Sequence, residues 1–85
     1  MNTYRYEDEK GSLFTENGQV MFLDIRDHIG RLLKEAGAVR MREVISQTAG
    51  DSWQRMACVD RMVELGELQE VTGDWVAGQY RVFTR

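Results

Sequence analysis

The stretch AVRMREVISQTAGDSWQRMACVDRMVELGELQEV, residues 38–71, decides the fold of this chain. Two parts of it carry apolar residues at spacings of three and four, which is the period of an α-helix. The spacing predicts a helix of about two turns over 41–49 and a second helix over 52–65. Gly50 and Gly66 follow these two runs, and a residue without Cβ readily adopts the left-handed conformation that ends many helices.

The join between the two helices carries a start signal for the second one. Asp51 is a good N-cap residue, and Gln54 stands three positions later, as in a reciprocal capping box. On this helix, the apolar spacing predicts that Met56, Val59 and Val63 face the core.

Extended segments are expected on both sides of this helical pair. Residues 38–41 form a short extended piece before it, and residues 68–72 and 79–84 are predicted strands after it. The loop 73–78 between these strands is bounded by glycines, which favours an antiparallel hairpin. Because a lone hairpin is marginal in water, this one should pack on the helices.

A longer helix is predicted upstream, from about Val20 to Ala36, with Asn17-Gly18 at its start and Gly37 as its stop. Its apolar stripe is too large to leave in water, so we expect the helix to form the base of the domain. The stripe consists of Phe22, Ile25, Ile29, Leu32, Leu33 and Ala36. The expected partners of the stripe are Val44, Ile45, Met56, Val59, Val63, Leu68 and Val82.

Residues 1–19 have a different residue pattern from residues 20–85, which we predict to be the main domain. Thr3 to Glu7 alternates aromatic and polar side chains, and Gly11 follows shortly after. Two interpretations are open at this point: a small hairpin, or a frayed acidic arm.

Residues 38–85 resemble the winged helix-turn-helix family. The residues that carry the resemblance are MREV at 41–44, the helix end MVELGEL at 62–68 and the closing strand YRVFT at 80–84. The resemblance implies an α+β fold: a small winged helix-turn-helix domain with a three-helix core and a C-terminal β-hairpin wing.

The resemblance also implies a double-stranded DNA partner, with the helix at 52–65 in the major groove and the wing near the minor groove. This helix is expected to show Gln54, Ala57, Cys58 and Arg61 on its outward face, with Trp53 and Arg55 at the flanks. Gln54, Arg55 and Arg61 would read or approach bases. The expected phosphate contacts are Arg40, Arg42 and Arg81.

We make separate predictions for the burial of the two tryptophans. Trp75 stands in the middle of the wing loop and either is exposed as a contact surface for DNA or a partner, or closes the core. Trp53, at the edge of the apolar stripe, is expected in the core.

Charge argues for a second function. The chain has 11 Lys and Arg against 14 Asp and Glu, a net charge of −3, and its wing loop contains Asp74 and no basic residue. Weak bulk attraction to nucleic acid follows. The alternative function is a winged-helix protein–protein interaction module, with a protein partner or a second copy in place of DNA.

Other classes are not supported by the sequence. Cys58 and His28 are the single cysteine and histidine, which is too few for a structural zinc set, and neither belongs to a nucleophilic set. We therefore expect no enzyme and no cofactor. The longest wholly apolar runs have four residues, whereas a membrane span needs about 20. The polar, acidic start and the lone cysteine predict a cytoplasmic protein.

Overall fold

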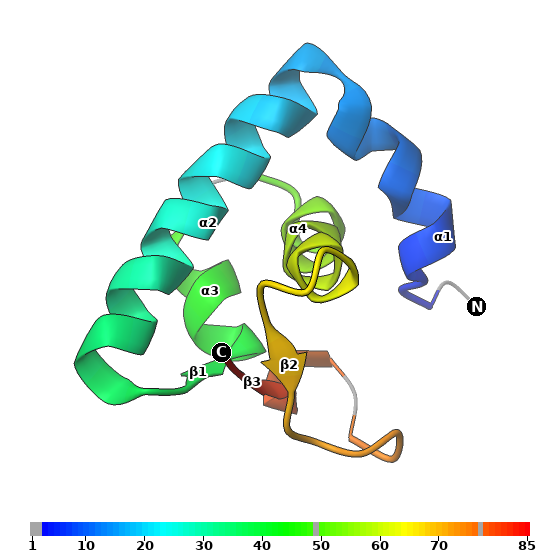
Figure 1. Cartoon of the computed structure of the whole chain (residues 1–85). Helices are drawn as coiled ribbons and strands as arrows, with labels where there is room; N and C mark the ends of the chain where they lie inside the picture. Colours follow the sequence, from blue (N-terminus) through cyan, green and yellow to red (C-terminus); the bar gives the residue numbers. More distant parts are fainter. Residues whose placement is uncertain (1–2, 49, 77) are drawn as a thin grey trace.

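The computed structural model describes residues 3–48, 50–76 and 78–85, which form an α+β fold (Figure 1). The elements in chain order are α1 (Tyr6–Glu9), the 3-10 helix η1 (Lys10–Phe14), α2 (Glu16–Ala36), β1 (Val39–Arg40), α3 (Met41–Gln47), α4 (Ser52–Glu64), β2 (Gln69–Glu70), the 3-10 helix η2 (Gly78–Tyr80) and β3 (Val82–Thr84). The predicted α+β class is therefore confirmed. The predictions for residues 1, 2, 49 and 77 fall outside the described residues.

The ends of the helices follow the signals in the sequence. The Asp51 side chain accepts hydrogen bonds from the backbone N–H groups of Trp53 and Gln54, at 2.9 and 3.1 Å, so the predicted cap of α4 is confirmed. Gly37 ends α2 with φ of 79°, and its N–H donates to the Leu33 carbonyl. The start of α2 lies earlier than predicted because Thr15, not Asn17, caps it.

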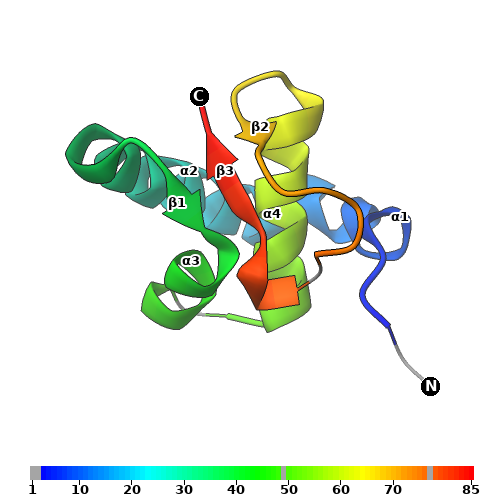
Figure 2. The same cartoon turned by 90° about the horizontal axis from the view of Figure 1, so that it is seen from below.

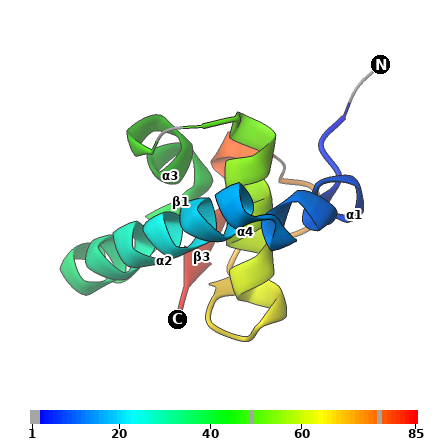
Figure 3. The same ribbon diagram turned by 90° about the horizontal axis from the view of Figure 1, so that it is seen from above.

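Helix α4 lies at the centre of the molecule and is seen end-on in Figure 1. Helix α2 crosses over one side of α4, and the sheet lies on the opposite side (Figures 2 and 3). Helices α1 and α3 flank α4 on its two remaining sides in both Figure 1 and Figure 3. The helix predicted to present an open face is thus enclosed by its neighbours.

The hydrophobic core confirms the predicted role of α2 as the base of the domain. Ile25 and Ile29 of α2 are fully buried in one cluster with Val44 of α3 and Val59 of α4. Three expected core partners differ. Ile45, Val63 and Val82 are only half-buried, and the buried neighbours of the last two are Met62 and Phe83. In the stripe of α2, Leu32 is half-buried and Ala36 is exposed.

The three short strands form one antiparallel sheet in the order β1-β3-β2. Phe83 pairs with Val39 on one side and with Glu70 on the other, and its side chain is fully buried. The predicted strand over 79–84 is shorter in the structure because Gly78–Tyr80 forms a 3-10 turn, closed by the Arg81 N–H on the Gly78 carbonyl.

The N-terminal segment is helical, so the hairpin interpretation is wrong for the described residues from Thr3 onward. Nor is the segment frayed, because Leu13 is 1 % exposed and belongs to the core. A Cβ on Gly18 would stand 2.0 Å from the Ser12 carbonyl oxygen. Glycine at this position therefore lets α2 pack tightly against η1.

Among the described residues, none of the helices combines the length and the apolar character that a membrane crossing requires.

Candidate interaction surface

The structure overturns the predicted outward face of α4. Ala57 and Cys58, both expected on that face, are fully buried in the core. Burial raises the pKa of the Cys58 thiol to about 12, so this cysteine is a packed side chain and a poor nucleophile. The helical spacing gave the wrong face because α4 is covered on several sides and carries no single apolar stripe.

The N-terminal segment, residues 3–14, covers one side of α4. The Tyr4 hydroxyl donates to Asp60 at 2.5 Å, and the Tyr6 hydroxyl donates to Glu64 at 2.9 Å. The Lys10 ammonium forms an ion pair of 2.8 Å with Glu64. These three contacts attach the segment to the C-terminal part of α4.

The side chains in this contact zone have shifted pKa values. Burial and the hydrogen bond to Asp60 hold the pKa of Tyr4 well above its ordinary value. Hydrogen bonds from Lys10, Arg61 and Tyr6 lower the pKa of Glu64 to about 2. The contacts therefore favour a neutral phenol and an ionised carboxylate at neutral pH.

Arg55, predicted to approach bases, is a buried structural residue with 9 % exposure. Its guanidinium donates to the backbone carbonyls of Ile45 and Thr48 at the end of α3, and to the Ser52 hydroxyl at 3.1 Å. The last carbonyls of a helix generally lack a partner inside that helix, and Arg55 supplies donors here. Arg55 thus joins α3 to α4 across the turn, and we correct its predicted placement on an open flank.

Arg81, predicted to contact phosphate, is held between two carboxylates. It pairs with Asp60 at 2.6 Å and with Glu70 at 2.8 Å, and its side chain is 14 % exposed. The hydrogen bonds that Arg81 donates to Glu70 lower the pKa of Glu70. Arg81, the residue before β3, therefore ties this part of the hairpin to α4 and β2, and this position does not leave it on the surface.

The remaining predicted residues are distributed over separate places. Arg61 is half-buried and pairs with Glu64 at 2.6 Å, while its guanidinium lies 5.3 Å from the ring centre of Phe14. Gln54 is half-buried in the first turn of α4. Arg40 and Arg42 are exposed at the start of α3 and have no hydrogen bond or ion pair from their side chains to another described residue.

The hairpin exposes large apolar side chains. Trp75 is 86 % exposed, so the interpretation in which it closes the core is wrong. Val71 and Tyr80, from the same hairpin, are 62 % and 65 % exposed. Trp53, in contrast, is half-buried and packs edge-on against Tyr4, with ring centres 6.5 Å apart.

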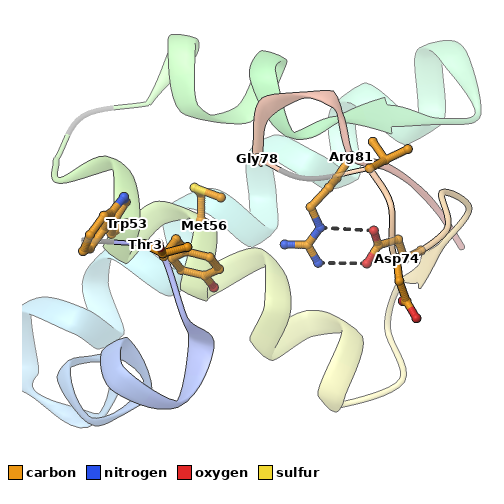
Figure 4. A pocket seen from close by; sticks show the side chains of 9 residues that line it. Thr3, Trp53, Met56, Asp74, Gly78 and Arg81 are labelled. Atoms are coloured by element: carbon orange, nitrogen blue, oxygen red, sulfur yellow. Dashed lines mark hydrogen bonds and ion pairs between the residues drawn. The ribbon is translucent and has the colours of Figure 1, made fainter. Parts of the chain in front are cut away.

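A cavity of about 560 Å³ opens between the N-terminal segment, α4 and the hairpin. Figure 4 shows Trp53, Thr3 and Met56 on one side of it, and Arg81 and Asp74 on the other. The full set of lining residues is Thr3, Tyr4, Trp53, Met56, Glu70, Asp74, Val76, Gly78 and Arg81. This cavity could not be predicted from the sequence because its walls come from three segments that are distant along the chain.

The chain matches no protein-family model, no curated protein and no solved structure.

Proposed function

We propose that this chain is a small winged-helix protein–protein interaction module. The order helix, strand, helix, helix and hairpin, with the sheet order β1-β3-β2, supports the winged-helix assignment. The observation that carries the function is the covering of α4. Its solvent side is occupied by residues 3–14, and two of its three candidate base-reading residues, Arg55 and Arg61, are engaged inside the chain.

The cover is part of the fold, which opposes a DNA-reading role for α4. Leu13 is fully buried, and large-to-small changes at such positions cost about 2–5 kcal/mol. That is a large share of the 5–15 kcal/mol or so that stabilises a typical domain. Displacing residues 3–14 so that α4 could enter a DNA groove would therefore destabilise the fold.

Charge on the covered helix and the hairpin also favours a protein partner. Their basic side chains Arg61 and Arg81 are paired with carboxylates, and Asp74 adds an exposed negative charge on the hairpin. Such a surface repels phosphate and offers no counterion release.

We assign the partner contact to the hairpin, through Val71, Trp75 and Tyr80. Large aromatic side chains are enriched in protein interfaces and supply much of their binding energy. Trp75 is the expected anchor because it is the most exposed of the large apolar side chains described.

The test is capture from a nuclease-treated extract of the native cells, with the wild-type chain and the variants Trp75→Ser and Val20→Ser. Val20 is equally apolar at the surface, 66 % exposed, but lies on α2. We expect a captured protein that is lost with Trp75→Ser and kept with Val20→Ser. The same capture is repeated with untreated extract. A protein captured from the untreated extract but not from the nuclease-treated extract would contradict the proposal. Self-association, which the same hairpin would also explain, is measured by sedimentation.

A second candidate function is double-stranded DNA binding, with a role in regulating transcription or a phage- or plasmid-type process. The observation that favours it is the exposure of Arg40 and Arg42, two residues apart at the start of α3. On this candidate the two arginines contact phosphate, and α4 contributes only its first turn at Gln54.

Duplex binding is tested by fluorescence anisotropy at low salt with random-sequence DNA. The interaction-module proposal expects no saturable binding at tens of micromolar protein. Binding that is lost in the double variant Arg40→Gln, Arg42→Gln and kept in Arg31→Gln would establish the DNA function instead.

A further inference from the structure

The cavity between residues 3–4, α4 and the hairpin has the size of a binding site. Its volume of about 560 Å³ lies within the range of small-molecule pockets, about 300–1,000 Å³. One wall is apolar and aromatic, with Tyr4, Trp53 and Met56. The opposite wall is charged, with Asp74 and Arg81 (Figure 4). Glu70, which pairs with Arg81, also lines the cavity.

The guanidinium of Arg81, which lines this cavity, is already paired with two carboxylates. Its Nε and Nη2 atoms donate to Glu70, at 3.1 and 2.8 Å, and its Nη1 and Nη2 atoms donate to Asp60, at 3.2 and 2.6 Å. These bonds use four of the five N–H donors of a guanidinium. One N–H of Nη1 remains, but two carboxylates already neutralise the charge of the guanidinium, so phosphate and carboxylate ligands are disfavoured.

The charge that remains is negative. Arg81 balances only one of its two carboxylate partners, and Asp74 adds a further negative charge on the hairpin side. The aromatic residues Tyr4 and Trp53 also line the cavity, and cations are attracted to aromatic faces within about 6 Å. Met56 and Val76 leave apolar surface for an alkyl stem.

We propose that this cavity binds a lysine or arginine side chain presented by the protein partner. The inference rests on the proposed interaction function and extends it, because Trp75 of the same hairpin lies next to the cavity residues Asp74 and Val76. The hairpin then contributes an aromatic anchor outside the cavity and an acidic wall inside it.

The first experiment needs no partner. In the Trp75→Phe chain the single remaining tryptophan is Trp53, so one indole N–H signal in a ¹H–¹⁵N spectrum reports on the cavity wall. The probes are N-acetylarginine amide and N-acetylcitrulline amide, which have nearly the same shape and differ in charge. We expect a saturable shift with the arginine probe at millimolar concentration, and binding of the citrulline probe at least about threefold weaker.

A matched pair of variants tests the acidic wall. Asp74→Asn should weaken binding of the arginine probe about two- to fivefold, the range of an exposed charge pair. Asp24→Asn removes the same charge from the exposed surface of α2, outside the cavity, and should leave the affinity unchanged. Both positions are exposed, so neither change should disturb folding.

Equal binding of the two probes, or no saturable shift of the Trp53 signal with either, overturns the proposal. Failure of this proposal and failure of the proposed function give different results. If capture of the partner depends on Trp75 and is unchanged by Asp74→Asn, the interaction module stands and the cation site is wrong. If no partner is captured while the arginine probe binds as expected, the cavity stands and the interaction function is wrong.

Discussion

The Tyr4 hydroxyl and the Asp60 carboxylate, 56 residues apart in the chain, are joined by a hydrogen bond of 2.5 Å. Asp60 also accepts from Arg81, so this one carboxylate links the N-terminal segment, α4 and the hairpin. The helix that sequence reasoning placed in a DNA groove is thereby tied to the segment that covers it.

Loss of the Tyr4 hydroxyl should weaken this link without removing the ring. We expect Tyr4→Phe to lower the free energy of unfolding by about 1–2 kcal/mol, because a hydrogen bond to a charged acceptor is lost. Tyr80→Phe is the control, since the Tyr80 side chain is exposed and makes no hydrogen bond to a described residue. Urea denaturation of both variants gives the comparison, and equal stability of the two would show that the link contributes nothing.

Acid should loosen the covering segment through Glu64. Its pKa is about 2 in the folded chain, below the ordinary value of 4.5, so its contribution to stability is present above pH 4.5. That contribution is lost as the pH falls toward 2. We expect Glu64→Gln to flatten the dependence of the urea midpoint on pH between about 5 and 2. The effect should shrink in high salt because the Lys10–Glu64 pair is partly exposed.

If wild type and Glu64→Gln lose stability in parallel over this pH range, Glu64 is not the group responsible. Glu16→Gln is a matched control, because Glu16 is exposed in the first turn of α2 and forms no ion pair with a described residue.

Replacement of Arg55 should damage the join between α3 and α4. We expect Arg55→Met to lower the free energy of unfolding by about 2–4 kcal/mol, because it leaves the carbonyls of Ile45 and Thr48 without a donor. Arg42→Met removes the same charge from an exposed position and should change stability by less than about 0.5 kcal/mol. Thermal and urea unfolding measure both. An Arg55→Met chain as stable as Arg42→Met would contradict the structural role.

The core position of α2 gives a further test. Ile29 is fully buried, and Ile29→Ala should destabilise the monomer by about 2–5 kcal/mol. Val20→Ala, at an exposed position on the same helix, should have little effect. An Ile29→Ala chain that kept its melting temperature and lost only self-association would make α2 an interface helix instead.

The sequence was sufficient where the signal is local. The 3.6-residue period and the terminal glycines located α2, α3 and α4, and Asp51 was recognised as a cap from its position alone. The base role of α2 followed from the size of its apolar stripe.

The candidate site was predicted less well because burial depends on distant segments. Arg55 and Arg81 have the pattern of surface arginines in the sequence, and only their partners, Ile45, Asp60 and Glu70 among them, place them inside. Leu13 lies in a segment too polar to suggest a core residue. Trp75 was correctly predicted to lie in the loop of the hairpin. Its exposure could not be predicted because it depends on how the hairpin folds.

The most direct test of the covered helix is a nuclear Overhauser spectrum of the whole chain in solution. With the segment 3–14 packed on α4, ring protons of Tyr4 should show cross-peaks to the Trp53 ring, and Phe14 ring protons should show cross-peaks to the Arg61 side chain. The account predicts both sets of cross-peaks at neutral pH. Their absence, with sharp random-coil signals for residues 3–14, would mean that α4 is open to solvent and would contradict the account.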